Sequence, residues 1–212
     1  MRIELVGGMG IGKTTLCNVL EEIGYHCIYE DLGTNPFLEG MYADPDNFRF
    51  TSQMWFVLAK YNELMTKLHP SSVNVIDQAM VNNRSYSNLL YKGGCCREKD
   101  IIDQTFAHVE YKFGKPDLLV YLKARPEIQM KRVHMRRRNF ELGVTLDYLT
   151  ELRDEIERLL DIEKEQGQKV VEINTDEIFL PDYHIFARQL AEDIARRLNF
   201  CLNAPAAPDA AE

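Results

Sequence analysis

The chain has 212 residues, 45% of them hydrophobic and 27% charged, a composition typical of a soluble globular domain with a hydrophobic core. Its formal net charge of −8 argues against a general nucleic-acid or acidic-membrane surface, because phosphate groups are bound by clustered Lys and Arg. No apolar run approaches about eighteen residues and the first expected strand begins at residue 2, so we expect neither a membrane span nor a signal peptide.

The first fourteen residues predict a strand followed by a phosphate-binding loop. Ile3 to Val6 form a short apolar run, and Gly7-x-x-x-x-Gly12-Lys13-Thr14 leads from it into a stretch with helical spacing. Glycines allow successive backbone N–H groups to surround a polyphosphate, at which the following helix points its positive end. Lys13 would neutralise the β- and γ-oxygens, and Thr14 would offer its hydroxyl to Mg²⁺. The residues expected to bind a nucleoside triphosphate here are Gly7, Gly8, Met9, Gly10, Ile11, Gly12, Lys13, Thr14 and Thr15.

Short apolar strands alternate with helical stretches along the rest of the chain, which indicates an α/β fold with a parallel sheet. We expect the strands near residues 2–6, 26–30, 73–77, 117–122 and 169–174. Asn35-Pro36 and Asp44-Pro45 each pair a cap residue with a first-turn proline, and the second pair opens a long helix to about Leu68. Further helices are predicted over 145–166 and 182–199. A single domain over residues 1–200 would then be followed by a disordered tail over 201–212.

Two acidic residues follow expected strands. Glu30 ends the second strand and Asp77 ends the third, and ligands of open parallel sheets gather at the carboxyl ends of the strands. Phosphoryl transfer needs one carboxylate near the attacking hydroxyl and another that serves Mg²⁺. Such an acid is about as often a helix cap, but two of them beside a phosphate loop favour a functional role.

The long helix after Asp44 carries polar residues that suit a nucleobase. Gln53 and Lys60 are seven residues apart, so they share one face of the helix. Seven aromatic residues between Phe37 and Tyr61 could line a pocket for a flat base. Most of these aromatic side chains are expected to fill the core instead.

A basic segment runs from Lys131 to Glu141. Arg132 and Arg136 lie one helical turn apart, and Arg138 is close by. The segment could be a basic surface helix or a nucleic-acid patch, but a phosphate loop calls for a cationic lid over the transferring phosphates. We therefore predict a lid over about residues 131–145.

These motifs, in this order, resemble the deoxynucleoside kinase family, especially its bacterial deoxyadenosine/deoxyguanosine-type members. The resemblance runs from the phosphate loop to about Asp176. Besides the loop, it includes Tyr29-Glu-Asp-Leu-Gly-Thr-Asn-Pro-Phe37, Tyr42-Ala-Asp-Pro45, Phe50-Thr-Ser-Gln53, Pro116-Asp-Leu-Leu-Val-Tyr-Leu-Lys-Ala124, Arg132-x3-Arg136-x-Arg138-x2-Glu141 and Leu146-Asp-Tyr-Leu149.

The resemblance implies a five-stranded parallel sheet with helices on both sides, often dimeric through two of its helices. It implies that Glu30 accepts the proton of the nucleoside 5′-hydroxyl and that Gln53 reads the base. Tyr42 and Glu141 would hold the sugar 3′-hydroxyl. The donor phosphates would be gathered by Arg132, Arg136 and Arg138.

One segment departs from the family pattern. After the third strand the family has an acid followed by arginine, whereas this chain has Asp77-Gln78. The Arg/Asp pair that the family places at the base is Lys60 and Asn83 here. Arg84 lies about 240° round a helix from Gln78, so a direct replacement is not expected. Losing a charged partner of the transition state costs a factor of about 10²–10³ in rate.

The sequence leaves three functions open. The first is an ATP- and Mg²⁺-dependent deoxynucleoside kinase, in which Glu30, Lys13, Asp77 and Arg136 act in catalysis and Thr14 and Asp77 organise the metal. The second is a catalytically weakened relative that binds nucleotide as a sensor or partner subunit. The third is a thymidylate-type monophosphate kinase, in which Arg49 or Arg84 would meet the acceptor phosphate. A homodimer is expected, and the five cysteines, without CxxC spacing, favour reduced thiols in a cytoplasm.

Overall fold

The structure is a computed structural model that describes residues 1–92, 96–136, 138, 141, 143–176, 185, 188, 189, 192 and 196. Within this part of the chain, five parallel strands form one sheet in the order β2-β3-β1-β4-β5. Their bounds are β1 Arg2–Val6, β2 His26–Ile28, β3 Asn74–Ile76, β4 Leu118–Lys123 and β5 Val170–Asn174. The predicted α/β fold with a five-stranded parallel sheet is confirmed, with β2 and β3 shorter than expected.

The helices are α1 Lys13–Glu22, α2 Leu38–Ala43, α3 Pro45–Thr66, α4 Met80–Leu90, α5 Arg97–Phe113, α6 Pro126–Arg136 and α7 Leu146–Glu165, with a 3₁₀ helix η1 at Leu32–Thr34. The predicted long helix and the helix over 145–166 correspond to α3 and α7. The helix predicted over 182–199 falls on a stretch of which only residues 185, 188, 189, 192 and 196 are described. The tail predicted over 201–212 lies outside the described residues.

The helix start predicted at Asn35-Pro36 is wrong. Asn35 ends η1, and its Oδ1 accepts a hydrogen bond from the backbone N–H of Phe37 at 3.0 Å. This short side-chain-to-backbone turn delays the helix, so α2 begins at Leu38. Asp44 does precede α3 with proline at its first position, but its side chain accepts from Asn47 Nδ2 at 2.7 Å rather than from a backbone N–H.

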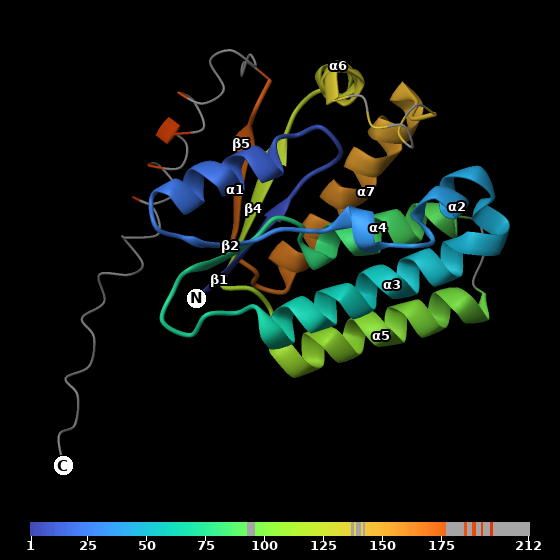
Figure 1. Ribbon diagram of the computed structural model, residues 1–212, viewed down its shortest axis with the longest axis horizontal. Coiled ribbons are helices and arrows are strands. Elements are labelled where there is room, and N and C mark those ends of the chain that lie inside the picture. Colours follow the sequence, from blue (N-terminus) through green and yellow to red (C-terminus); the bar gives the residue numbers. More distant parts are fainter. Residues whose placement is uncertain are drawn as a thin grey trace.

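Successive side chains of β1 face opposite sides of the sheet. Ile3 and Leu5 pack with Leu16 and Leu20 of α1 in one core cluster. Val6 belongs to a second cluster, to which Val81 of α4 and Leu152, Ile156 and Leu160 of α7 contribute. Figure 1 shows α1 on one side of the sheet and α4 and α7 on the other. The sheet is therefore buried on both faces, as its apolar strands require.

A third core cluster joins β2 and β3 to the pair of helices α3 and α5. Ile28 and Ile76, the last residues of these strands, pack with Val57 and Leu64 of α3. Ile102, Phe106 and Val109 complete the cluster from α5. In Figure 1, α3 lies between α4 and α5. This packing brings α3 close to the residues that directly follow β2 and β3.

Candidate active site

The phosphate loop between β1 and α1 needs glycine for geometric reasons. Gly7, Gly10 and Gly12 have φ values of +150°, +68° and +102°, which side-chain-bearing residues rarely adopt. A Cβ atom on Gly7 would lie 2.6 Å from the carbonyl oxygen of Leu122. The Lys13 ammonium donates to the carbonyl oxygens of Gly7 at 2.8 Å and Gly8 at 3.0 Å. The lysine is thus folded over the loop that a phosphate would occupy.

Thr14 and Asp77 meet beside this loop. The Thr14 hydroxyl donates to Asp77 Oδ2 at 2.7 Å, which joins the start of α1 to the end of β3. The other carboxylate oxygen, Asp77 Oδ1, is buried without a hydrogen-bond partner among the described residues. A hydroxyl beside a carboxylate with an unused oxygen fits the oxygen ligands that Mg²⁺ prefers.

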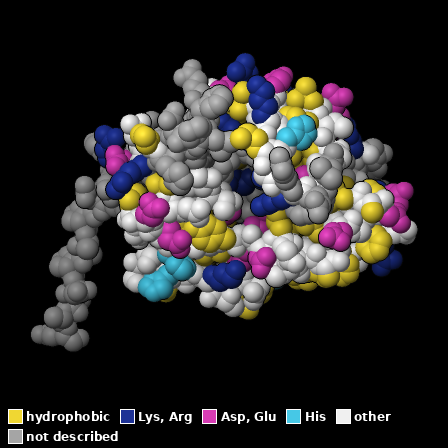
Figure 2. All heavy atoms as spheres, turned by 45° about the horizontal axis from the view of Figure 1, so that its top comes forward, with side chains coloured by type: hydrophobic (Ala, Val, Ile, Leu, Met, Phe, Trp, Pro, Cys, Tyr) yellow, Lys and Arg dark blue, Asp and Glu magenta, His cyan; other side chains and the backbone are white. Residues whose placement is uncertain are grey.

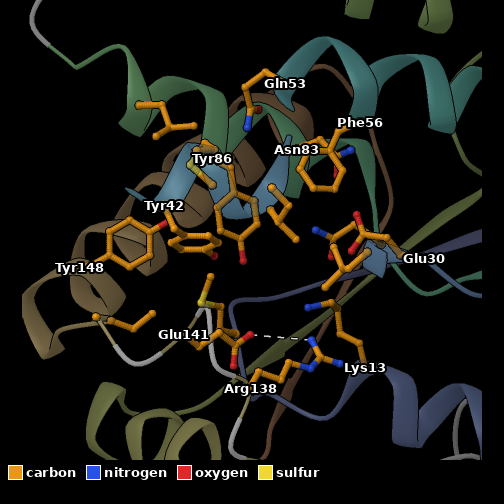
Figure 3. Close-up of a pocket in the computed structure, with 18 of the residues that line it drawn as sticks. Lys13, Glu30, Tyr42, Gln53, Phe56, Asn83, Tyr86, Arg138, Glu141 and Tyr148 are labelled. Atoms are coloured by element: carbon orange, nitrogen blue, oxygen red, sulfur yellow. Dashed lines mark ion pairs between the residues drawn. The ribbon is translucent and has the colours of Figure 1, made fainter. Parts of the chain in front are cut away.

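A cavity of about 430 Å³ opens over the carboxyl ends of β1, β2 and β3. Most predicted site residues line it, namely Met9, Lys13, Thr14, Glu30, Tyr42, Gln53, Asp77, Gln78, Asn83, Arg136, Arg138 and Glu141. Figure 2 shows Lys and Arg side chains, in dark blue, in a hollow near the centre of the face drawn. In the close-up, Lys13 and Glu30 lie at one end of the cavity and Tyr148 lies at the other (Figure 3). Lys60 and Arg132 do not line this cavity.

Glu30 lies two residues beyond β2, half-buried in the cavity. Burial raises the pKa of its carboxyl group to about 7, and the nearby ammonium groups of Lys60 and Lys13 counteract part of this effect. Desolvation in turn lowers the pKa of the Lys13 ammonium, against the attraction of Asp77 and Glu30. A carboxyl group with a pKa near neutrality can accept a proton and release it again at physiological pH.

Three tyrosines from separate helices surround the opposite part of the cavity. They are Tyr42 of α2, Tyr86 of α4 and Tyr148 of α7 (Figure 3). Burial raises the pKa of Tyr42 to about 12, with a further contribution from the charge of Glu141. Burial also raises the pKa values of Tyr86 and Tyr148. All three phenols therefore remain neutral and can donate hydrogen bonds to a sugar or base.

Gln53 of α3 and Asn83 of α4 provide the polar groups above Glu30 in Figure 3. Both side chains are buried, with 2% and 4% of their surface exposed. Gln53 Oε1 and Asn83 Oδ1 have no hydrogen-bond partner among the described residues. Two buried acceptors without donors are costly unless a ligand supplies N–H groups.

Lys60 lines a different cavity from Gln53. Its ammonium pairs with Glu63 at 2.7 Å on the same helix, and both side chains are buried. The pair lines a second cavity of about 430 Å³, which shares Glu30, Phe56 and Asn83 with the first cavity. The spacing of seven residues predicted a shared face of α3, and both side chains are buried, but it did not predict that they line different cavities.

The predicted lid arginines make different contacts. Arg136 holds Glu141 through two nitrogens, with Nε 2.7 Å from Oε2, and Arg138 lies 3.7 Å from the same carboxylate. Arg132 instead donates to the backbone oxygen of Thr175 at 2.6 Å and to its hydroxyl at 3.1 Å. Arg136 and Arg138 are thus in the cavity, whereas Arg132 connects α6 to the end of β5.

Two arginines considered for other roles point away from the cavity. Arg84 pairs with Glu110 of α5 at 2.7 Å, so it does not replace the family arginine at position 78. Arg49 lies over the ring of Tyr91, with its Cζ 4.6 Å from the ring centroid. Neither residue lines the cavity, which removes the phosphate contact expected of a monophosphate kinase.

Sequence reasoning missed several residues of the cavity. Phe56 is one of seven aromatic residues between Phe37 and Tyr61, and nothing in the sequence sets it apart from the others. Tyr86 belongs to no motif that predicts a role in the site. Tyr148 lay within a family motif but received no role. Asn82, which contacts the phosphate loop, could have been suspected only from its place in the first turn after Asp77.

Comparison with known proteins agrees with this geometry. A sequence model of the family described as "Deoxynucleoside kinase" matches residues 3–199, nearly the whole chain. The chain belongs to the deoxynucleoside kinase family. Phosphoryl transfer to a deoxynucleoside is the activity that characterises this family, and the sensor and monophosphate kinase alternatives are not favoured.

Curated relatives in this family differ in the base that their names specify. A probable deoxycytidine kinase of fowlpox virus is 29% identical over 195 residues, covering 85% of this chain and 81% of the relative. A deoxyadenosine kinase of Dictyostelium discoideum is 25% identical over 184 residues, with 85% and 74% covered. A deoxyadenosine/deoxycytidine kinase of Bacillus subtilis is 25% identical over 170 residues, with 73% and 74% covered. Membership of the family therefore does not by itself identify the base.

Solved structures of a deoxyadenosine kinase from M. mycoides share the fold. The complex with bound dCTP superposes with a TM-score of 0.75 at 19% sequence identity and covers 94% of this chain and 99% of that chain. The three-layer arrangement of this deoxynucleoside kinase is thus that of the solved enzyme. Among the described residues, no helix is long and apolar enough to cross a membrane.

Proposed function

We propose that this chain transfers the γ-phosphoryl group of ATP to the 5′-hydroxyl of a deoxynucleoside, with Glu30 as the base. The observation that carries the proposal is the position of Glu30, a carboxyl group with a pKa of about 7 in the same cavity as Lys13. Glu30 would accept the proton of the 5′-hydroxyl as that oxygen attacks phosphorus. The two substrates would meet over the carboxyl ends of the strands.

The phosphate loop and Lys13 bind the donor in this proposal. Lys13 would exchange the carbonyl oxygens of Gly7 and Gly8 for phosphate oxygens, and the backbone N–H groups at the start of α1 would donate hydrogen bonds to the other phosphate oxygens. Arg136 and Arg138, which line the same cavity as Lys13, would approach the transferring phosphoryl group. We assign the function of the lid to the segment that carries Arg136 and Arg138. Arg132 has the separate role of anchoring α6 to Thr175.

Thr14 and Asp77 would hold Mg²⁺. Among the described residues no group of three or more His, Cys, Asp or Glu side chains is arranged for a metal ion, so these two would share the ion with ATP phosphates and water. When bound, the ion neutralises the charge that develops on the phosphate oxygens. Asp77 would orient it through Oδ1, which is buried and has no other partner among the described residues.

The base would meet Gln53 and Asn83, and the sugar would meet Tyr42 and Glu141. Because both amides offer a buried acceptor oxygen, we infer a preference for bases with an exocyclic amino group over thymine. Adenine, cytosine and guanine all carry this group, and the names of the relatives described above specify adenine and cytosine. Tyr42 and Glu141 lie near each other in the cavity, where the 3′-hydroxyl of a deoxyribose could contact both.

A homodimer through α3 and α5 is part of the proposal. Leu58 and Met65 of α3 are 56% and 55% exposed, and Tyr111 of α5 is 88% exposed. Large apolar side chains exposed on two adjacent helices favour burial against a second copy. Light scattering of the purified chain should give twice the mass of one chain, and Leu58→Asp combined with Met65→Asp should halve it. A wild-type monomer would contradict this part of the proposal.

The test of the function is steady-state turnover with ATP and Mg²⁺ against the four deoxynucleosides and their 5′-monophosphates. We expect phosphorylation of at least one nucleoside that carries an exocyclic amino group, at a rate at least ten times that with thymidine. Turnover with monophosphates alone, or ATP binding without any turnover, would contradict the proposal.

A further inference from the structure

Asn82 connects the phosphate loop to the acceptor side of the cavity. It lies in the first turn of α4, and none of its surface is exposed. Its Oδ1 accepts the backbone N–H of Gly7 at 3.0 Å. Its Nδ2 donates to the carbonyl oxygen of Leu5 at 3.4 Å and to Gln78 Oε1 at 2.9 Å. One buried amide thus contacts β1, the loop that follows it, and the residue after Asp77.

Backbone groups determine which way the Asn82 amide faces. A backbone N–H can only donate and a backbone carbonyl can only accept, so Gly7 must face the oxygen of Asn82 and Leu5 must face its nitrogen. The Asn82 nitrogen is therefore also the atom that faces Gln78. Since that nitrogen is a donor, Gln78 must turn its oxygen toward it. The chain Gly7–Asn82–Gln78 has a single consistent direction.

This direction fixes what Gln78 presents to the cavity. Gln78 is 6% exposed and lines the cavity. Its Oε1 accepts the hydrogen bond from Asn82, so its NH₂ group is the part that can bind a ligand. A hydroxyl about to lose its proton and a transferring phosphoryl group both present oxygens that accept hydrogen bonds. A donor at this position would stabilise the charge that develops on them, whereas an amide oxygen would repel it.

We propose that Asn82 is a positioning residue that holds Gly7 in place and orients Gln78, so that Gln78 acts as a neutral hydrogen-bond donor to the reacting oxygens. The identity of those oxygens rests on the proposed function. The Leu122 carbonyl closes the other side of Gly7, where an added Cβ atom would lie 2.6 Å from its oxygen, so no side chain fits there. Asn82 therefore supports both substrates: ATP through Gly7, and the acceptor through Gln78.

Kinetics of two variants and their combination test the proposal. Gln78→Met, which keeps the size and removes the donor, should lower kcat about 10- to 100-fold and leave the Kd for ATP within about twofold. Asn82→Leu should lower kcat by at least as much and should also raise the Kd for ATP about tenfold, because Gly7 loses its acceptor. In the Asn82→Leu background, Gln78→Met should change kcat by no more than about twofold, since Asn82 acts through Gln78.

Asn88→Leu is the matched control. Asn88 lies on the same helix, but its side chain contacts α7 rather than the loop, because its Nδ2 donates to Glu155 at 2.6 Å. We expect kcat and the Kd for ATP to remain within about twofold of the wild type. Losses in kcat that multiply in the double variant, or equal losses in the control, would overturn the positioning role.

A measurement on the wild-type chain covers the case in which the variants do not fold or no nucleoside is turned over. The side-chain NH₂ signals of Asn82 and Gln78 can be assigned by NMR in ¹⁵N-labelled protein. The Asn82 protons should be protected from solvent exchange, whereas the Gln78 protons should exchange rapidly and shift when a non-hydrolysable ATP analogue and a deoxynucleoside are added. Gln78 side-chain protons that are protected from exchange and whose chemical shifts do not change with either ligand would overturn the proposal. If the NMR signals behave as expected but no nucleoside is phosphorylated, the proposed reaction is contradicted and the positioning role of Asn82 is not.

Discussion

The guanidinium of Arg136 holds the carboxylate of Glu141 through two nitrogens, with Nε 2.7 Å from Oε2. Glu141 is 4% exposed, and its partner comes from the end of α6, five residues earlier. The two groups thus close one wall of the cavity over the place we assign to the sugar. A bidentate pair of this kind is geometrically specific, so Arg136 fixes the position of the Glu141 carboxylate.

Glu141→Gln should therefore raise the KM for the deoxynucleoside about tenfold or more and leave the Kd for ATP nearly unchanged. The neutral amide keeps one acceptor for a sugar hydroxyl but no longer offers a charged one. Steady-state kinetics with each substrate varied in turn would measure the split. Glu127→Gln, in the first turn of α6 and outside the cavity, is the control. A larger effect on ATP than on the nucleoside would contradict the assignment.

The pH dependence of turnover should report the ionisation of Glu30. Its raised pKa of about 7 predicts that kcat/KM rises with pH up to about 7 and then levels off, because only the carboxylate can accept the hydroxyl proton. Glu30→Gln should lower kcat about 10²- to 10⁴-fold with the Kd for ATP nearly intact. A variant with wild-type turnover, or a rate independent of pH between 5 and 8, would remove Glu30 from the mechanism.

Lys60 and Glu63 should move this pH profile in opposite directions. The Lys60 ammonium lowers the pKa of Glu30 and the Glu63 carboxylate raises it, while Lys13 at the start of α1 lowers it and Asp77, directly after β3, raises it. Lys60→Met should therefore shift the acidic limb of the profile to higher pH, and Glu63→Gln should shift it to lower pH. Lys99→Met, which removes a lysine paired with Asp103 on α5, should leave the limb unchanged. Parallel shifts in both variants would contradict this account.

Much of the fold could be predicted because it is encoded locally. The apolar run from Ile3 to Val6 and the motif that ends in Lys13-Thr14 identify β1, the loop and α1 without knowledge of distant residues. Proline after Asp44 likewise marked the start of α3. Asn35-Pro36 predicted a helix start at the wrong residue, because the Asn35 side chain accepts the backbone N–H of Phe37 and forms a short turn there.

The candidate site could be predicted in part, where single residues follow strands or form motifs. Glu30 and Asp77 were found because the ends of parallel strands converge. Lys60 was paired with Gln53 by helical spacing, but only packing shows that Phe56 borders both cavities and that Glu63 neutralises the lysine. Asn82 acts through contacts with residues 75 and 77 positions away, Gly7 and Leu5, which no local pattern encodes.

Glu30 should also make the stability of the ligand-free protein depend on pH. Its folded-state pKa of about 7 lies above the ordinary value of 4.5, so between these values the folded state binds more protons than the unfolded state. The free energy of unfolding should then fall as pH rises from about 4.5 to about 7 and stay lowered above that range. Each pKa unit corresponds to about 1.4 kcal/mol, so a difference of about 2.5 units makes the contribution of this one group about 3–4 kcal/mol. Urea unfolding of the wild type and of Glu30→Gln at pH 5, 6 and 8 isolates the contribution of Glu30. The contributions of the other titrating groups cancel in the difference between the two free energies of unfolding. We expect the variant to gain stability over the wild type as pH rises, and a difference that stays constant across this range would show that Glu30 titrates at its ordinary pKa.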